Sequence, residues 1–152
     1  APEKLELLEK VRGMAAVRLG LCDDYTRSAW ETPGIPKMTF VAPAADYTTV
    51  TGQEISADKI DLLSRMMSMQ KTHPTYAMTG AMCTAAAAII PGSVVQQVLR
   101  PDVDTQFIRI AHPGGILEAG VDYTVREDGS VDVEDTFGFR TANLLAEGTA
   151  FC

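Results

Sequence analysis

The chain has 152 residues, the length of one ordinary domain, and its 46% hydrophobic and 22% charged residues are typical of a globular protein. Its net charge of −7 argues against nucleic acid or an anionic membrane surface as the main partner. The longest apolar run, residues 85–90, is far too short to span a bilayer. Three cysteines, Cys22, Cys83 and Cys152, match neither a disulfide framework nor a zinc site, so we expect a reducing, cytoplasmic setting.

The front of the chain predicts a helix, a loop and a short strand. Apolar residues at helical spacing predict the first helix, and they are Leu5, Leu8, Val11, Ala15 and Leu19. Because this helix starts almost at the first residue, we expect the front of a longer protein to be missing. A loop with prolines and glycine follows, and residues 37–41 predict a short buried strand between Pro36 and Pro43.

A second helix is predicted over residues 57–67. Ser56 suits its N-cap, and Asp58 places a negative charge in the first turn, where the helix dipole favours it. One apolar face of this helix would hold Ile60, Leu63 and Met67. A third, alanine-rich helix is predicted from Thr79 to about Ile90, where Pro91-Gly92 ends it.

From Gln106 onward the apolar pattern changes to a period of two, which predicts consecutive β-strands. Asp128-Gly129 suits a hairpin turn between two of them, and residues 147–152 suit a last strand. With helices in front and strands behind, the sequence predicts a single α+β domain over residues 1–152.

The alanine-rich helix has no polar side chain between Ala81 and Ile90 except Thr84, which predicts burial on all sides inside a curled sheet. Its first turn would still carry free N–H groups. Thr79 would cap one, Gly80 would let a ligand approach, and Lys71 and His73 would border the resulting anion site. An ordinary helix entry without a ligand is the commoner alternative.

A second unusual segment is "RIAHPGGIL", residues 109–117, in which His-Pro-Gly-Gly interrupts a strand pattern. The paired glycines indicate either exposed amides beside a ligand or simply a bulge or tight turn. The lead-in to the alanine-rich helix and this segment each contain a histidine, and this coincidence favours a site that binds a carboxylate. Cys83 lies in the first helical turn, where it is either an activated thiol or a small buried core residue. Because free cysteines are commonly buried, we favour the second interpretation.

Four segments together resemble the PrpF-type methylaconitate and methylitaconate isomerases, a group that includes 4-oxalomesaconate tautomerases. They follow in the same order over nearly the whole chain, and they read "IPKMTFVAPAADY", "IDLLSRMMSMQKTHPTYAMTGAMCTAAAAIIPGSVV", "IRIAHPGGIL" and "RTANLLAEG". The resemblance implies a diaminopimelate-epimerase-like fold, in which a curved, mostly antiparallel sheet wraps round a central helix. It also implies that this chain is the C-terminal half of a two-domain protein.

The chemistry implied by the resemblance is a cofactor-independent proton shift along an allyl system in a small unsaturated di- or tricarboxylate. The implied Lys and Cys that act as acid and base would lie in the N-terminal domain, so this half would bind substrate carboxylates and be inactive alone. Its partners would be that substrate and the N-terminal domain. An uncovered domain-facing surface would favour self-association.

Residue by residue, the resemblance implies a substrate-binding role for three groups, which are Ser68, Lys71 and His73, then Thr79, Gly80 and Ala81, then His112, Pro113, Gly114 and Gly115. It implies no catalytic residue and no metal ligand in this half. Two departures bear on the substrate. Gly114 stands where the family has Ser, and Asn143 and Leu144 stand where many members are more basic.

Two other functions fit the same residues. An epimerase or racemase of this fold would use a thiol at each helix start, so Cys83 would have to reach the cleft. A carboxylate-binding domain without chemistry of its own would use the anion site to bind a metabolite.

Overall fold

A computed structural model describes residues 2–139, 144–145 and 147–149 of the chain. In chain order its elements are α1 (Pro2–Arg18), η1 (Tyr25–Arg27), α2 (Ser28–Glu31), β1 (Met38–Pro43), β2 (Tyr47–Thr48), β3 (Glu54–Ile55), η2 (Ala57–Lys59), β4 (Leu62–Ser68), β5 (Lys71–Thr72), α3 (Met78–Ile89), α4 (Val94–Val98), β6 (Phe107–His112), β7 (Gly115–Val125) and β8 (Val131–Gly138). The predicted α+β composition is confirmed.

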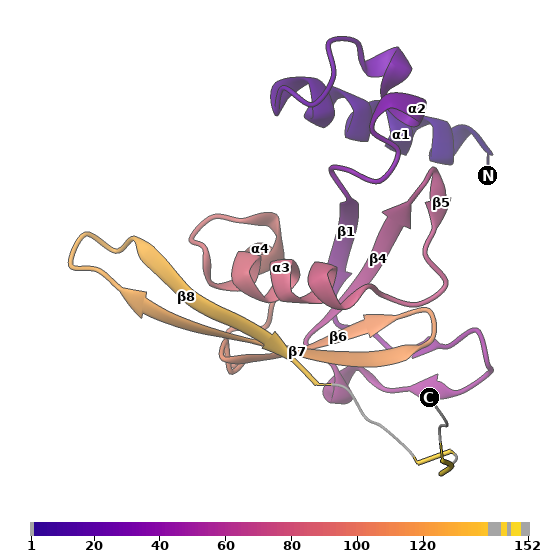
Figure 1. The fold of residues 1–152 in the computed structure, drawn as a ribbon. Helices are drawn as coiled ribbons and strands as arrows, with labels where there is room; N and C mark the ends of the chain where they lie inside the picture. Colours follow the sequence, from indigo (N-terminus) through magenta and orange to yellow (C-terminus); the bar gives the residue numbers. More distant parts are fainter. Residues whose placement is uncertain (1, 140–143, 146, 150–152) are drawn as a thin grey trace.

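The main sheet curls round α3, as the resemblance implied (Figure 1). Its strands lie in the order β1-β4-β6-β7-β8, and β5 pairs with β4 at one end. Every pairing is antiparallel except that of β4 with β6, which is parallel. The strands β2 and β3 form a separate hairpin that lies against the end of β6 through the hydrogen bonds described below.

The core lies between α3 and the concave face of the sheet. Small side chains on the inner face of α3, such as Ala81 and Ala85, are fully buried and let the strands approach the helix closely. They pack against larger side chains from the central strands, including Leu62, Ile108 and Ile110. The alanine-rich sequence is thus explained by the tight curvature of the sheet round its central helix.

The predicted helix over residues 57–67 was wrong. Residues 57–59 form one short 3-10 turn, and β4 follows with side chains that alternate between the two faces, so that Leu62, Ser64 and Met66 are buried against α3. Ile60, Leu63 and Met67 happen to have helical spacing, but β1 and β6 supply strand hydrogen bonds on both sides of the segment. Tertiary pairing therefore overrides the helix propensity of this leucine- and methionine-rich run.

Burial of α3 on all sides was also wrong. Thr79 and Cys83 are exposed, whereas Thr84, the one polar residue of the helix body, is buried. The curled sheet covers only one side of the helix, and Thr84 is satisfied there by hydrogen bonds. Neither α3 nor any other helix in the described part of the chain has both the length and the apolar character to cross a membrane.

The start of α3 differs from the predicted cap. The helix begins at Met78, its N-cap residue is Ala77, and no side chain caps it. Thr79 therefore lies inside the first turn instead of preceding it. The predicted end is confirmed, since the helix stops at Ile89 and Gly92 follows with a φ of 76°.

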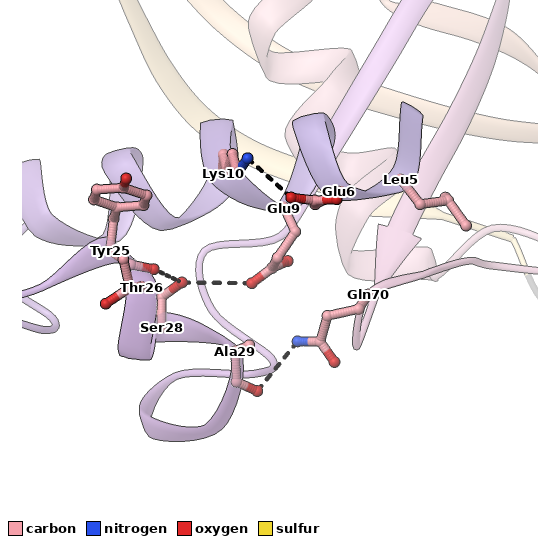
Figure 2. A pocket seen from close by; sticks show the side chains of 9 residues that line it. All are labelled: Leu5, Glu6, Glu9, Lys10, Tyr25, Thr26, Ser28, Ala29 and Gln70. Carbon is pink, nitrogen blue, oxygen red and sulfur yellow. Dashed lines mark hydrogen bonds and ion pairs between the residues drawn. The ribbon is translucent and has the colours of Figure 1, made fainter. Parts of the chain in front are cut away.

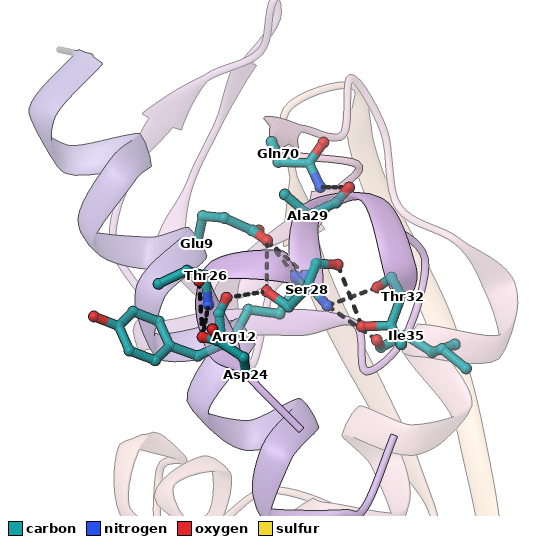
Figure 3. A network of polar contacts seen from close by, with 10 residues as sticks. Glu9, Arg12, Asp24, Thr26, Ser28, Ala29, Thr32, Ile35 and Gln70 are labelled. Carbon is teal, nitrogen blue, oxygen red and sulfur yellow. Dashed lines mark hydrogen bonds and ion pairs between the residues drawn. The ribbon is translucent and has the colours of Figure 1, made fainter. Parts of the chain in front are cut away.

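The first helix is confirmed as α1, but its inner face is anchored by a charged residue. Arg12 is only 4% exposed, and its Nη1 donates to the carbonyls of Thr32 (2.8 Å) and Ile35 (2.9 Å), while Glu9 accepts from its Nε and Nη2 (Figure 3). Val11 and Leu19, which were placed on the apolar stripe, are exposed. Arg12 thus ties α1 to the loop that leads into β1.

The strand predictions in the second half are largely confirmed. Residues 107–112 and 115–125 form β6 and β7, joined by the two residues Pro113 and Gly114. Asp128-Gly129 forms the turn between β7 and β8, with Gly129 at a φ of 81°. No strand forms over residues 147–149, and the rest of the predicted last strand, like Asn143, lies outside the described residues. Residues 38–41 of the predicted strand fall within β1, which is half-buried and extends to Pro43, whereas Lys37 precedes it.

Candidate functional site

Two segments that are distant in sequence meet beside the start of α3. One is the lead-in from His73 to Ala77, and the other is the β6–β7 turn. A Cβ atom placed on Gly114 would lie only 3.1 Å from Cγ2 of Thr75, so the two segments are in contact. This contact also shows what the departure at Gly114 means, because a serine there would need Thr75 to move.

His112 ends β6 and is 9% exposed. Its Nδ1 accepts a hydrogen bond from the Gly114 N–H at 3.1 Å. Burial lowers the pKa of His112 below its ordinary value of 6.5, and the positive charges of Arg65 and His73 lower it further. The ring is therefore neutral near pH 7, and since Nδ1 is the acceptor, Nε2 carries the proton.

His73 has the same local arrangement. Its Nδ1 accepts from the Thr75 N–H at 3.1 Å, so in its neutral form it also carries its proton on Nε2. The backbone N–H of His73 donates to the Met66 carbonyl at 2.8 Å, and this bond fixes the lead-in against β4. Within the described residues, neither Nε2 donates a hydrogen bond, so both remain available to a ligand oxygen.

Tyr76 fixes the lead-in against the core. Its hydroxyl is 2.8 Å from the hydroxyl of Ser64 on β4 and 3.0 Å from that of Thr84 on α3. Thr84 in turn donates to the Gly80 carbonyl at 2.8 Å. The Tyr76 ring lies 6.3 Å from that of His112, centroid to centroid. A buried polar chain thus links the strand, the lead-in and the helix start.

The first turn of α3 offers three backbone donors. The N–H of Ala81 donates to the Ala77 carbonyl, so Met78, Thr79 and Gly80 are the first-turn amides without a partner in the helix. Gly80 also has a packing role, because a Cβ at this position would overlap Cε of the buried Met66. The glycine therefore makes room for Met66 in the core.

The structure separates two of the predicted residues from the others. Ser68 and Lys71 face each other at the tip of the β4–β5 hairpin. The turn residue Gln70 bonds the Ala29 carbonyl of α2 at 3.2 Å, so this tip lies near the N-terminal helices (Figure 1). The candidate site therefore contains His73, His112, Pro113 and Gly114, with the first turn of α3 beside them. Ser68 and Lys71 lie apart from it, at the β4–β5 tip.

Three residues beside the site, Arg65, Thr75 and Tyr47, were not among those predicted from the sequence. Arg65 was placed on a helix, although the alternation along β4 puts it on the face opposite the core. Tyr47 and Thr75 carry no motif of their own, and only the fold brings them to the histidines. A strand assignment for residues 62–68 would have found Arg65.

Of two other hollows, one lies apart from this site and the other reaches its edge, since Thr79 and Gly80 also line it. A cavity of about 400 Å³ lies between α1, α2 and the β4–β5 tip, where Glu6 bonds Lys10 and Glu9 accepts from Ser28 (Figure 2). A groove of about 330 Å³ along α3 includes Lys37 and Cys83. Cys83 is exposed there, which corrects its favoured assignment to the core, because this side of α3 is not covered by the sheet.

The described residues contain no cluster of three His, Cys, Asp or Glu side chains that could hold a metal ion. The histidines and the helix start instead present N–H donors, which recognise carboxylate oxygens.

Comparison with known proteins agrees with this fold. The chain is 38% identical over 148 residues to 3-methylitaconate isomerase of Eubacterium barkeri and 33% identical over 144 residues to 2-methyl-aconitate isomerase of Shewanella oneidensis. These matches cover 97% and 95% of the chain, but only 38% and 36% of the two relatives. The chain therefore spans less than two fifths of their length.

A solved structure of methylitaconate-delta-isomerase superimposes with a TM-score of 0.75 at 35% identity, covering 90% of this chain and 36% of the other. The model of the PrpF protein family matches residues 1–152. With the curled sheet round α3 and these matches, the chain belongs to the PrpF family.

Proposed function

We propose that the protein containing this chain is an isomerase that moves a proton and a double bond in a small unsaturated di- or tricarboxylate. The methylitaconate and methylaconitate isomerases among its relatives support this substrate class. The observation that carries the role of this chain is the pair of histidines, each with Nδ1 held by a backbone N–H and Nε2 free as a donor.

In the proposed reaction a base removes a proton from the carbon next to the double bond. The electron pair delocalises into the adjacent carboxylate as a dienolate, and a proton returns to the far end of the allyl system. Substrate and product therefore have the same atoms. The donors of this chain would hold the carboxylate on which negative charge develops, and such donors act most strongly when they are already oriented. We place the acid and base residues in the part of the protein beyond this chain.

A proton-shift assay in deuterated buffer tests this proposal. The full-length protein is incubated with 3-methylitaconate, 2-methylaconitate or 4-oxalomesaconate, and NMR follows the migration of the double bond and the entry of deuterium. Isomerisation of one of these acids is the expected result. Binding without exchange would favour a carboxylate-binding domain, and neither binding nor exchange would overturn the assignment of the substrate class.

One observation bears on an epimerase or racemase as the second candidate. Cys83 is exposed, as such a reaction would require, but it is the sixth residue of α3 and lies in its second turn. A Cys83→Ser variant separates the two functions. The isomerase proposal predicts unchanged proton shift in this variant, whereas an epimerase that used this thiol would lose exchange at the chiral carbon.

A further inference from the structure

The β6–β7 turn is held from outside by the β2–β3 hairpin. The hydroxyl of Tyr47 lies 2.6 Å from the Gly115 carbonyl and 3.2 Å from the His112 carbonyl, so a single O–H group bridges both ends of the turn. The Val50 N–H donates to the Pro113 carbonyl at 2.8 Å. Three contacts from one short hairpin, to the carbonyls of His112, Pro113 and Gly115, therefore fix the backbone on which His112 stands.

Arg65 supports Tyr47 from β4. Its guanidinium carbon lies 5.6 Å from the centroid of the Tyr47 ring, within the range of a cation–π contact. Its Nη1 donates to the Ser64 carbonyl at 2.8 Å and to the Ala111 carbonyl at 3.3 Å. Arg65 thereby connects the tyrosine ring with the residue that precedes His112.

The geometry of the turn determines the protonation pattern of His112. The Gly114 N–H reaches Nδ1 only because the turn between His112 and Gly115 is tight. If the turn relaxed, Nδ1 would lose its donor, and the neutral ring could place its proton on either nitrogen. The ring would then present a donor to the ligand for only part of the time.

We propose that Tyr47 is a positioning residue, whose hydroxyl holds the His112–Gly115 turn so that His112 keeps its proton on Nε2 and donates it to a substrate carboxylate. The hydrogen bond from His112 to a substrate carboxylate rests on the proposed function, whereas the fixed tautomer of His112 does not. Tyr47 acts through His112 and is not itself a catalytic residue.

The test compares Tyr47→Phe with wild type in the full-length protein. The substitution removes one oxygen and keeps the ring that Arg65 contacts. In wild type, ¹⁵N NMR of the histidine rings at pH 8 should show His112 with its proton on Nε2, and Tyr47→Phe should show a mixture of both tautomers. Tyr25→Phe is the matched control, because Tyr25 is exposed and belongs to η1 near the N-terminal helix. The His112 spectrum of this variant should equal that of wild type.

Kinetics provide the second readout. Because His112 would hold the carboxylate on which negative charge develops, loss of its fixed donor should lower kcat/KM roughly three- to tenfold in Tyr47→Phe, with part of this loss in kcat. A pure Nε2 tautomer in a folded Tyr47→Phe protein would overturn the proposal. If this variant does not fold, the wild-type spectrum provides the second measurement, and a mixture of both His112 tautomers there at pH 8 would overturn the proposal.

The two proposals fail in different ways. A full-length protein that isomerises none of the acids, yet shows the tautomer change, would refute the substrate class and leave the role of Tyr47 standing. An active isomerase with the same His112 tautomer in both proteins would refute the role of Tyr47 alone.

Discussion

His112 is the residue whose environment has the clearest consequence for pH dependence. Its pKa is lowered first by burial and then by the charges of Arg65 and His73, so the native state resists protonation. As pH falls below 6.5, the unfolded chain binds this proton before the native chain does. The contribution of His112 to the free energy of unfolding should therefore decrease from pH 6.5 downward and level off once pH is below the native pKa.

An NMR titration of His112 in wild type and Arg65→Gln checks this cause. Removing the cation should raise the pKa of His112, but burial, the larger cause, should keep it below 6.5. A variant pKa equal to that of wild type would show that Arg65 does not act on His112. A native pKa above 6.5 would contradict the burial argument.

Tyr76 is a second residue with a measurable role. Tyr76→Phe removes the hydroxyl that lies between those of Ser64 and Thr84 and leaves two buried polar groups with fewer partners. We expect a loss of about 1–3 kcal/mol in the free energy of unfolding, measured by urea denaturation. Tyr123→Phe, whose hydroxyl bonds Thr105 in a half-buried place, should cost less. Equal stability of wild type and Tyr76→Phe would mean that the chain of hydroxyls contributes nothing.

At this scale the sequence predicted the histidines but not the residues that orient them. His73 and His112 stand in short polar motifs, which draw attention to them without a fold. Tyr47 is 65 residues from His112 in the chain, and their hydrogen bond exists only because β2–β3 packs against the end of β6. Such partners cannot be found before the strand order is known.

At the scale of elements, the errors have a common origin. The segment 57–67 was interpreted from the spacing of three apolar side chains, and the environment of α3 from its composition. In both cases the neighbouring elements decide the outcome. The strands β1 and β6 flank β4 and make it a strand, and the curled sheet covers only part of α3. Hairpins closed by local turn residues, such as Asp128-Gly129, were predicted well because their geometry is set by those residues themselves.

Arg12 makes the stability of the N-terminal helices testable. Arg12→Lys keeps the charge but cannot reach the carbonyls of Thr32 and Ile35 and the carboxylate of Glu9 together, since an ammonium lacks the planar fork. We expect a loss of about 2 kcal/mol in the free energy of unfolding, because these bonds are buried and charged.

Arg27→Lys is the control for this substitution. Arg27 pairs with Glu31 on the surface, where ion pairs contribute little, so its replacement should change stability by less than about 0.5 kcal/mol. Equal effects of the two substitutions would contradict an anchoring role for Arg12. Deuterium exchange of the α1 amides would show whether any loss is confined to this helix.

At the scale of the whole molecule, the sequence motifs predicted the family and the general fold, since the matched segments extend over the full chain. The chain alone holds one side of the proposed chemistry, with N–H donors from the lead-in, the β6–β7 turn and α3. The chain spans 38% of the length of its relative from Eubacterium barkeri, and we propose that the acid and base lie outside this chain. The predicted substrate-binding roles of Ser68 and Lys71, which lie at the β4–β5 tip, stay predictions.

The most direct test of the account is the affinity of the full-length protein for methylsuccinate, a saturated dicarboxylate that cannot isomerise, measured by titration calorimetry at pH 8. Removing the Nε2 donor in His112→Phe, which keeps a planar ring, should weaken binding roughly tenfold or more, whereas Cys83→Ser should bind as wild type does. Equal affinity of His112→Phe and wild type would contradict the claim that the two histidine-bearing segments form the carboxylate site.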